Sequence, residues 1–469
     1  MNNETEEYKK NHDDPMRCGT ITYTKVGLAV MFGWMLWGIF WFAMMNFQLI
    51  PNLLPLSLKE FKASNAMIGL LVGSLPAAIN MVLNPIISFR SDRTRSKWGR
   101  RIPYLLATIP FTTLFLILMG WTPNLAAGLS RLLPFELSAP QLGLGLIAVF
   151  SLGFQFFNMF AASVYYYLFA DVVPEKFMGR FMAAYNFSGS LAGFLFARFI
   201  LPFAENFDNL KWIYTGVSLF YFITFMLLCW RVREGQYPPP SDAAERSGFV
   251  AGVKLYFREC FSLSYYRWFF LGTAINAVSV ICRTMFNVFF ARENLGMDMA
   301  AYGKALSWGV LTGLVLVLPL GMAVDRFRPI RVHLFGTALV VVVNALGFFM
   351  IQSETSFIVF TVLLGVVYVL QQVSNVPMYV ELLPKERFGQ FCSAQAMVQS
   401  VILIAANYGG GLFMDWTGDY RYIYVWDFMW TTLALVALVI VFRGWKKYGG
   451  TKDYVAPMDH VGQASGQAD

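Results

Sequence analysis

The stretch that decides the fold runs from Asn84 to Tyr104 and reads NPIISFRSDRTRSKWGRRIPY. It contains six basic residues and a single acidic residue, Asp92. The apolar segments 66–89 and 103–121 lie on either side of the basic part, and each is long enough to cross a lipid bilayer as a helix. A basic loop between two such segments is typical of the cytoplasmic side of a membrane protein.

The composition of the whole chain agrees with this interpretation. Of the 469 residues, 57% are apolar and 14% are charged, with a mean hydropathy of +0.53. Ordinary soluble domains have roughly 25% charged residues, and soluble cores stop growing near about 250–300 residues. A soluble fold could not bury this much apolar surface, so the composition excludes a soluble enzyme and also a disordered chain.

Twelve apolar segments of spanning length follow one another, and we predict an all-α membrane protein with twelve transmembrane helices in two six-helix bundles. The predicted spans are 26–50, 66–89, 103–121, 143–169, 180–203, 212–230, 267–290, 301–324, 332–351, 357–380, 393–414 and 423–443. The predicted domains are an N-terminal tail 1–25, a first bundle 26–230, a central loop 231–264, a second bundle 265–445 and a C-terminal tail 446–469.

Basic residues set the orientation of such a chain. Of its 36 lysines and arginines, 27 lie in the tails and in the loops after even-numbered spans, seven lie in the opposite loops, and Arg198 and Arg283 lie inside spans. We therefore expect a multi-pass protein of the cytoplasmic membrane with both termini in the cytoplasm. The anionic lipid surface explains the net charge of +8, so we expect no nucleic-acid partner, and we expect a monomer.

The two halves repeat each other. The fourth span ends in DVVPEKFMGR (171–180) and the tenth in ELLPKERFGQ (381–390), with carboxylate, proline and glycine at the same spacing. Asp92-Arg93 after the second span is echoed by Asp325-Arg326 after the eighth. Two six-helix halves with a parallel repeat are the organisation of a rocking transporter, which has its substrate site between the halves.

Carboxylates at helix ends and arginines in the neighbouring loops can pair across helices and hold one conformation closed. We interpret this set as gating residues, although loop arginines can also serve only to orient the chain. The set comprises Asp92, Arg93, Arg95, Arg100, Arg101, Asp171, Arg180, Asp325, Arg326 and Glu381.

Residues 84–104 resemble the loop of the major facilitator superfamily, whose pattern is G-x-x-x-D-R-x-G-R-R. Ser88 replaces the first glycine of that pattern, while Gly321 matches it in the second half. The shorter stretch SDRTRSKWGRRIPY is similar to the glycoside–pentoside–hexuronide:cation symporters and to the sucrose transporter group. The resemblance implies alternating-access transport of a small sugar or glycoside. The matching residues are Asp92, Arg93, Arg95, Gly99, Arg100 and Arg101.

The same resemblance raises a question about cation coupling. Symporters of this group use aspartates on the second helix, and the matching positions here are Asn80 and Asn84, with Asn158 near the matching position on the fourth helix. Asparagine can offer a carbonyl oxygen to Na⁺, but it supplies no counter-charge and binds no proton. The sequence therefore leaves open coupling to H⁺, coupling to Na⁺, and uncoupled transport.

Polar side chains share faces on several predicted helices. Amides offer donors and acceptors that suit the hydroxyls of a neutral polyol, and tryptophans can stack on a sugar ring. Each of these side chains could instead pack between helices. The expected substrate contacts are Asn80, Asn84, Gln155, Asn158, Arg283, Asn287, Gln371, Gln372, Asn375, Gln399, Trp34 and Trp37.

Two alternatives stay open. Arg283 lies within the seventh span, where a charge costs several kcal/mol unless it has a partner or a wet cavity, so it could bind an anionic substrate such as a hexuronate or an organic acid. An alternative of another class is a non-transporting membrane sensor or assembly factor on the same scaffold.

Motifs for other chemistry are missing from the sequence. It contains no G-x-x-x-x-G-K-[ST], G-x-S-x-G or H-E-x-x-H pattern, so we expect no ATP-driven transport and no enzyme. Its five cysteines form no CxxC pair, and we expect no metal site and no cofactor besides a coupling ion, H⁺ or Na⁺. His12, His333 and His460 are placed in tails or at a loop edge, which argues against a proton relay inside the membrane.

Overall fold

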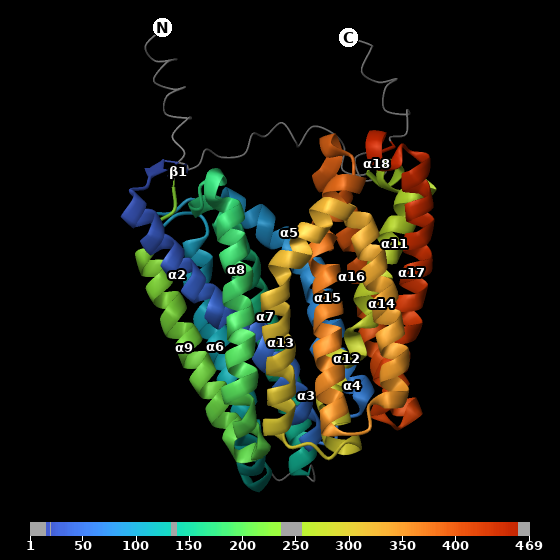
Figure 1. The fold of residues 1–469 in the computed structure, drawn as a ribbon. Coiled ribbons are helices and arrows are strands. Elements are labelled where there is room, and N and C mark those ends of the chain that lie inside the picture. Colours follow the sequence, from blue (N-terminus) through green and yellow to red (C-terminus); the bar gives the residue numbers. More distant parts are fainter. Residues whose placement is uncertain (1–15, 19, 133–137, 236–255, 458–469) are drawn as a thin grey trace. The chain divides into compact units, whose positions relative to one another are not determined.

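The computed structural model describes residues 16–18, 20–132, 138–235 and 256–457 (Figure 1). The predicted tails 1–25 and 446–469 and the predicted central loop 231–264 therefore lie partly outside the described residues. His12 and His460 lie wholly outside them.

Twelve helical stretches in the described part of the chain are long and apolar enough to cross a membrane, as predicted. A short antiparallel pair, β1 (Arg17–Cys18) and β2 (Ile21–Thr22), precedes the first of them. Spans one to six are α2 (Lys25–Ala43), η1 (Met44–Leu49) and α3 (Ile50–Glu60); α4 (Asn65–Gly69), η2 (Leu70–Ser74) and α5 (Leu75–Arg93); α6 (Ile102–Leu132); α7 (Ala139–Val172); α8 (Glu175–Leu195), η3 (Phe196–Ile200) and η4 (Leu201–Glu205); and η5 (Phe207–Asn209) with α9 (Leu210–Arg231).

Spans seven to twelve form the second set. These spans are α11 (Ser264–Ser279), α12 (Ile281–Phe289) and η7 (Phe290–Asn294); α13 (Met299–Phe327); α14 (Pro329–Met350); α15 (Glu354–Leu382); η8 (Lys385–Arg387) leading into α16 (Phe388–Thr417); and η9 (Tyr420–Tyr422) with α17 (Ile423–Lys447). A short helix, α18 (Gly450–Asp453), follows the last span.

Several helices begin where a side chain caps the first free N–H groups. The Thr24 hydroxyl accepts a hydrogen bond from the Gly27 N–H at 3.0 Å, at the start of α2. The Asp298 carboxylate does the same for Ala301 at 2.7 Å, at the start of α13. Such caps are visible in the sequence and typically contribute about 0.5–2 kcal/mol each.

Some helices run further than the hydropathy predicts. The first span continues to Glu60 where the predicted segment ends at 50, and the third continues to Leu132 where it ends at 121. Hydropathy identifies the apolar segment that crosses the hydrocarbon layer. A helix can continue beyond this segment through polar residues. Pro123 lies inside α6 without ending it.

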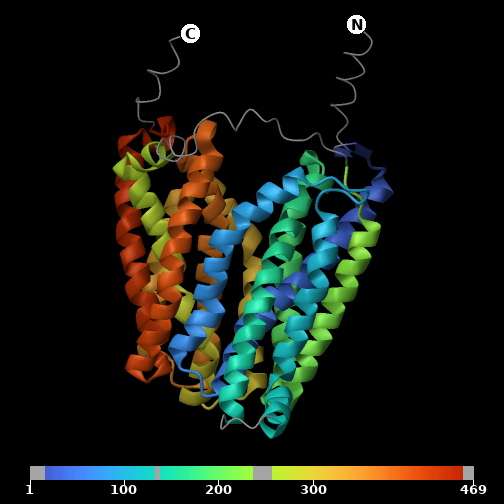
Figure 2. The same cartoon turned by 180° about the vertical axis from the view of Figure 1, so that it is seen from behind.

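The chain divides into two compact units. Unit 1 comprises residues 1–63 and 79–241, and unit 2 comprises residues 64–78 and 242–469. The first part of the second span, α4 with η2, thus belongs to unit 2, where it packs on α16 (Figures 1 and 2).

Four helix–helix contacts in unit 1 have equivalents in unit 2. In unit 1, α2 packs on α8 and α9, and α6 packs on α7 and α9. In unit 2, α11 packs on α16 and α17, and α14 packs on α15 and α17. The equivalent spans are six apart in each case, so the internal repeat seen in the loop sequences extends to the packing of the helices.

Glycines bring α4 and α16 into backbone contact. A Cβ atom added to Gly69 would overlap the carbonyl oxygen of Asn407, and one added to Gly411 would overlap the carbonyl oxygen of Asn65. Small residues are the usual means of close helix approach in membranes. Only glycine fits at these two places without a shift of the backbone.

The same contact is fixed at the start of α4 by polar groups. The Asp415 carboxylate accepts hydrogen bonds from the N–H groups of Asn65 (2.9 Å) and Ala66 (2.8 Å). The Tyr420 hydroxyl donates to the side-chain oxygen of Asn65 at 2.9 Å. A negative charge at a helix N-terminus is favourable, so Asp415 holds this end of α4 in unit 2.

Two glycines of α16 provide a matched test of the packing. Gly411→Ala is expected to lower the free energy of unfolding by about 1–3 kcal/mol, because the new methyl group overpacks the contact. Gly409, two residues earlier, has open space around it, so Gly409→Ala should stabilise the helix by about 0.5–1 kcal/mol. Thermal unfolding of both variants in detergent measures the difference, and equal midpoints would contradict this account of the contact.

Candidate functional site

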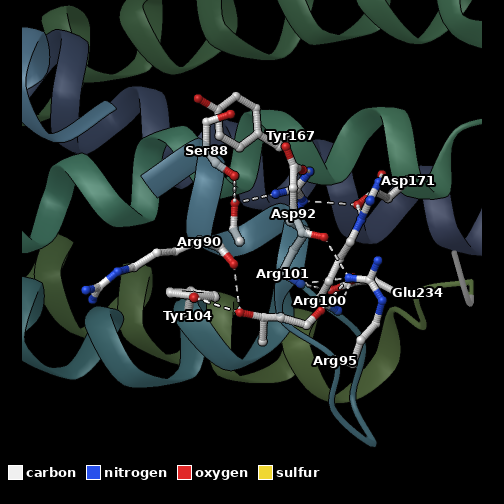
Figure 3. A network of polar contacts seen from close by, with 12 residues as sticks. Ser88, Arg90, Asp92, Arg95, Arg100, Arg101, Tyr104, Tyr167, Asp171 and Glu234 are labelled. Carbon is white, nitrogen blue, oxygen red and sulfur yellow. Dashed lines mark hydrogen bonds and ion pairs between the residues drawn. The ribbon is translucent and has the colours of Figure 1, made fainter. Parts of the chain in front are cut away.

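A cluster of charges surrounds Asp171 at the end of α7 (Figure 3). The Arg100 Nε donates to Asp171 Oδ2 at 2.8 Å, and the Arg101 Nε donates to the same oxygen at 3.1 Å. A second nitrogen of Arg101 lies 2.5 Å from Asp92 Oδ1. The predicted gating residues Asp92, Arg100, Arg101 and Asp171 are therefore brought together, and their gating role stays a prediction.

Glu234, which follows α9, completes this cluster and is not predicted from the sequence. Its carboxylate accepts hydrogen bonds from the backbone N–H groups of Arg100 (2.7 Å), Arg101 (3.0 Å) and Ile102 (2.6 Å), at the start of α6. Gly99 precedes them with φ +107°, and a Cβ atom there would lie 2.5 Å from the Glu234 carboxyl carbon. Glycine is thus required twice at this position, for its backbone angle and for space.

Burial raises the pKa of the Glu234 carboxyl, and the charge of Asp171 raises it further. The three backbone N–H donors lower it, but they do not cancel the effect of burial. Glu234 therefore takes up a proton at a higher pH than a solvent-exposed glutamate.

Three other predicted gating arginines, Arg95, Arg93 and Arg180, contact residues that lie close to them in the sequence. Arg95 donates to the carbonyl oxygens of Asp92 and Thr94, both at 2.7 Å. The Arg93 guanidinium carbon lies 3.6 Å from the ring centroid of Phe89. Farther along the chain, the guanidinium carbon of Arg180 lies 5.9 Å from the ring centroid of Phe177.

The corresponding place in unit 2 uses a different arginine from the one predicted. Asp325 and Arg326 are exposed, and the pair is formed by Arg328 and Glu381, with 3.9 Å between Nη1 and Oε1. Arg328 has a positive φ of 74° and also donates to the Thr451 carbonyl oxygen. Both units thus join an arginine from the loop after their second span to a carboxylate at the end of their fourth.

A cavity of about 280 Å³ is lined by residues of unit 2, and four of the predicted substrate contacts are among them: Gln371, Gln372, Asn375 and Gln399. Within it, Gln371 donates to Thr337 Oγ1 at 3.0 Å and to Asn276 Oδ1 at 3.3 Å. The Gln399 side-chain oxygen accepts from Gln395 at 2.7 Å. The lining residues are Thr273, Asn276, Ala277, Val280, His333, Tyr368, Gln371, Gln372, Asn375, Tyr379 and Gln399.

The sequence predicts that His333 lies at a loop edge, and the structure shows that this prediction is wrong. His333 is buried within α14, it lines the cavity, and its Nδ1 lies 3.0 Å from Ser374 Oγ. The helix begins at Pro329, before the predicted span, and this places the imidazole inside the unit.

The seventh span is broken next to this cavity. Val280, with φ −83° and ψ −2°, separates α11 from α12 and lines the cavity. The Trp426 indole N–H donates to the Val278 carbonyl oxygen at 3.0 Å and so satisfies a group at the break. Non-helical backbone at membrane depth is tolerated only inside protein or beside a cavity. No glycine or proline marks this break, so the sequence contains no signal that predicts it.

Arg283 lies just after the break and does not line the cavity. It forms an ion pair with Asp427 of α17, with 2.5 Å between Nη2 and Oδ2. Asn287, one turn further along α12, is partly buried, and its Oδ1 has no hydrogen-bond partner among the described residues.

In unit 1, two of the four predicted contact residues on α5 and α7 form hydrogen bonds to side chains of other helices. The Asn84 oxygen accepts from the Tyr167 hydroxyl at 2.7 Å, and Asn158 donates to the Asn46 oxygen at 2.7 Å. Asn80 is partly buried and Gln155 is buried. Their roles in binding stay predictions.

Two tryptophans of the first span, Trp37 and Trp41, pack against neighbouring aromatic rings. Trp37, 46% exposed, stacks on Phe40 at 5.6 Å, and Trp41 stacks on Phe220 of α9 at 4.7 Å. Trp34 is partly buried. Packing accounts for Trp41, whereas the exposed face of Trp37 is free to contact a ligand or lipid.

The chain was compared with protein families and with solved structures. A family model described as MFS/sugar transport protein matches residues 40–420, more than half of the chain. Solved structures with a similar fold include a mutant of the nucleoside transporter NupG (12% identity, TM-score 0.64, covering 88% of this chain and 99% of that one). A bacterial homologue of the human lysosomal transporter Spinster, inward-facing and occupied, is 13% identical with a TM-score of 0.63 (88% and 96% covered). A D-xylose-proton symporter is 11% identical with a TM-score of 0.59 (88% and 96% covered). These likenesses show the fold alone.

The position of Glu234 leads to a prediction about the charge cluster. Glu234→Ala leaves three backbone N–H groups without their acceptor and is expected to lower the free energy of unfolding by about 1–3 kcal/mol. Glu234→Gln, which keeps one acceptor oxygen, should lose less. Thermal unfolding in detergent measures both. Glu175→Ala removes an exposed carboxylate of the same unit and serves as the control, and an equal loss in that control would contradict the capping role.

Proposed function

The chain belongs to the family of MFS/sugar transport proteins, and from this we propose that it moves a small neutral sugar or glycoside across the membrane by alternating access. It is an integral, multi-pass membrane transporter and shares its fold with transporters that are not enzymes. The observation that carries the proposed substrate is the chemistry of the cavity in unit 2.

The cavity wall suits a ligand rich in hydroxyl groups. Its described side chains are amides, hydroxyls, one imidazole and small apolar groups, with no carboxylate or guanidinium among them. Amides can both donate to and accept from a sugar hydroxyl. A volume of about 280 Å³ is just below the roughly 300–1,000 Å³ of sites for drug-sized ligands, and therefore fits a small solute.

A neutral substrate is favoured over an anionic one by the state of Arg283. Its charge is compensated by Asp427 at 2.5 Å, so an anion would have to displace a buried carboxylate to reach it. A hexuronate or another organic acid is the second candidate, and a transport assay distinguishes the two.

The remaining assignments form part of the same proposal. We propose that Asn80, Asn84, Gln155 and Asn158 of unit 1, with Trp34 and Trp37, supply further substrate contacts. The arginine–carboxylate pairs at Asp171 and Glu381 act as gate contacts that break during the transport cycle. The protein acts as a monomer in the cytoplasmic membrane, with both termini in the cytoplasm.

Transport by purified protein tests the substrate class. Proteoliposomes preloaded with unlabelled sugar should exchange it for labelled D-xylose, D-glucose or sucrose, and labelled D-glucuronate should exchange slowly or not at all. Preference for D-glucuronate that Arg283→Gln abolishes would instead establish the anionic alternative. Failure to exchange any neutral saccharide would overturn the proposal.

Two cavity variants locate the site. Gln372→Ala and Asn375→Ala remove exposed amides that line the cavity, and each is expected to weaken sugar binding by about 1 kcal/mol, roughly a fivefold rise in KM. Ser400→Ala is the control, because Ser400 does not line the cavity and bonds within its own helix to the Ala396 carbonyl oxygen at 2.9 Å. An unchanged KM in both amide variants would remove the cavity from the binding site.

A further inference from the structure

A buried ion pair lies in unit 2 behind the wall of the cavity. Arg283 of α12 binds Asp427 of α17 through Nε (2.7 Å) and Nη2 (2.5 Å), both to Oδ2. Asp427 is completely buried, and the Arg283 side chain is 14% exposed. Replacing a buried ion pair by apolar residues is often neutral or stabilising, and ionisable groups inside the membrane usually mark ion or substrate pathways. Stability alone therefore does not explain the pair.

The surroundings keep Arg283 satisfied without the charge of Asp427. A guanidinium nitrogen of Arg283 donates to the side-chain oxygen of the buried Asn344, and the guanidinium carbon lies 4.6 Å from the ring centroid of Tyr424. A neutral amide oxygen and an aromatic face both stabilise a cation. Asp427 can thus become neutral while the arginine keeps two partners.

Asp427 also offers a place for a proton. Its Oδ1 is buried and has no hydrogen-bond partner among the described residues. A proton that adds there converts the carboxylate to a carboxylic acid, which can form and lose the O–H bond without any further reactant. A sodium ion at the same place would lie beside the guanidinium of Arg283 and be repelled by it.

Few other titratable groups face this carboxyl group. Cys282 comes from α12, Tyr368 from α15 and Tyr424 from α17 itself, while Tyr302 of α13 lies near Arg283. In the described part of the chain, no charged residue of α11 or α14 is among the groups that act on Asp427, and the neutral amide of Asn344 on α14 bonds to Arg283. Of the groups named, only a carboxyl has an ordinary pKa on the acid side of neutrality.

Tyr368 connects the ion pair to the cavity. Its hydroxyl donates to Asp427 Oδ2 at 3.4 Å, and the same residue lines the cavity one helical turn before Gln371 and Gln372. A sugar hydroxyl that binds the Tyr368 hydroxyl competes with Asp427 for it. Binding in the cavity and protonation of Asp427 are then linked, and the linkage acts equally in both directions.

We propose that Asp427 is the proton-binding site of a proton-coupled transporter, with Arg283 as its resting counter-charge and Tyr368 as the link to the substrate. This inference rests on the proposed sugar transport for its second half, the coupling. The proton site itself stands on the geometry of unit 2.

The proton site is tested without any sugar. In infrared spectra of the reconstituted protein, acidification should produce the carbonyl stretch of a buried protonated carboxyl group. Asp427→Asn should lack this band, and the control Asp208→Asn, at an exposed position of unit 1, should retain it. Persistence of the same band in Asp427→Asn would overturn the proton site. The double variant Arg283→Gln/Asp427→Asn removes both charges together and should lack the band as well, which keeps the test valid should the single variant fold poorly.

Coupling is tested in proteoliposomes with the saccharide of the panel that exchanges fastest. A gradient of one pH unit should concentrate it about tenfold for one proton per sugar, and a sodium gradient should not. In Asp427→Asn the ratio of uptake with and without the pH gradient should fall to about one. In the wild-type protein, adding the sugar should shift the carboxyl band, because the sugar competes for the Tyr368 hydroxyl. Tyr368→Phe should keep the band but lose this shift. Concentration driven by sodium, or an unchanged ratio in Asp427→Asn, would overturn the coupling. If the wild-type protein exchanges no saccharide, both the proposed sugar transport and its coupling to protons are overturned. The infrared test still decides whether Asp427 is a proton-binding site.

Discussion

The structure depends on one constraint: inside a bilayer, a polar group that finds no partner in the protein finds none at all. Helices satisfy the backbone, and the remaining polar atoms must satisfy one another. The break at Val280 is an example, because the Trp426 indole N–H donates a hydrogen bond to the Val278 carbonyl oxygen beside the break. The Gln371 amide and the Arg283–Asp427 pair find partners in the same way, whereas Asp427 Oδ1 has none among the described residues. The cavity and the ion pair, where we propose that the solute and the proton bind, are two of the places where such polar groups gather.

The internal repeat shows what the two units share and what each has changed. Four helix–helix contacts of unit 1 recur between the equivalent spans of unit 2, whereas the packing of α13 on α15 is a feature of unit 2. The charged contacts at the ends of the fourth and tenth spans differ in composition. Two adjacent arginines share Asp171 in unit 1 at 2.8 and 3.1 Å, whereas a single, looser pair joins Arg328 and Glu381 at 3.9 Å in unit 2. Arg100 also donates through Nη2 to the other oxygen of Asp171, and such a bidentate contact is stronger than a single long ion pair. The repeat thus preserves the position of the carboxylate, while the strength of its contact differs between the units.

Features that depend on local pattern are predictable from the sequence. Twelve apolar segments, the loop motif and its family are readable because each lies in one continuous stretch. The structure places the amides Gln371, Gln372 and Asn375 of α15 and Gln399 of α16 in one cavity, while their role in substrate binding stays a prediction. Most predicted spans end before their helices do, because hydropathy reflects the apolar layer of the membrane, whereas a helix continues as long as its backbone hydrogen bonds do.

Features that depend on contacts between distant segments are not predictable in this way. Glu234 is an ordinary glutamate after a span, and only the fold brings it to the start of α6. The pairing of Arg283 with Asp427 spans 144 residues, so the arginine alone suggests a site for an anion. The helix break at Val280 has no glycine or proline, and His333 is buried because α14 begins earlier than its apolar segment. Tertiary contacts decide all four.

The capping of α6 by Glu234 has a consequence for the order of events during synthesis. The Ile102 amide and its acceptor are 132 residues apart, and a ribosome adds about 5–20 residues per second, so roughly 7 to 26 s separate them. Throughout that interval the loop from Asp92 to Arg101 is already made, but its backbone amides lack their final partner. The loop can take its final form only after the sixth span has been synthesised. The charge cluster around Asp171 is therefore completed only when the synthesis of unit 1 is nearly finished.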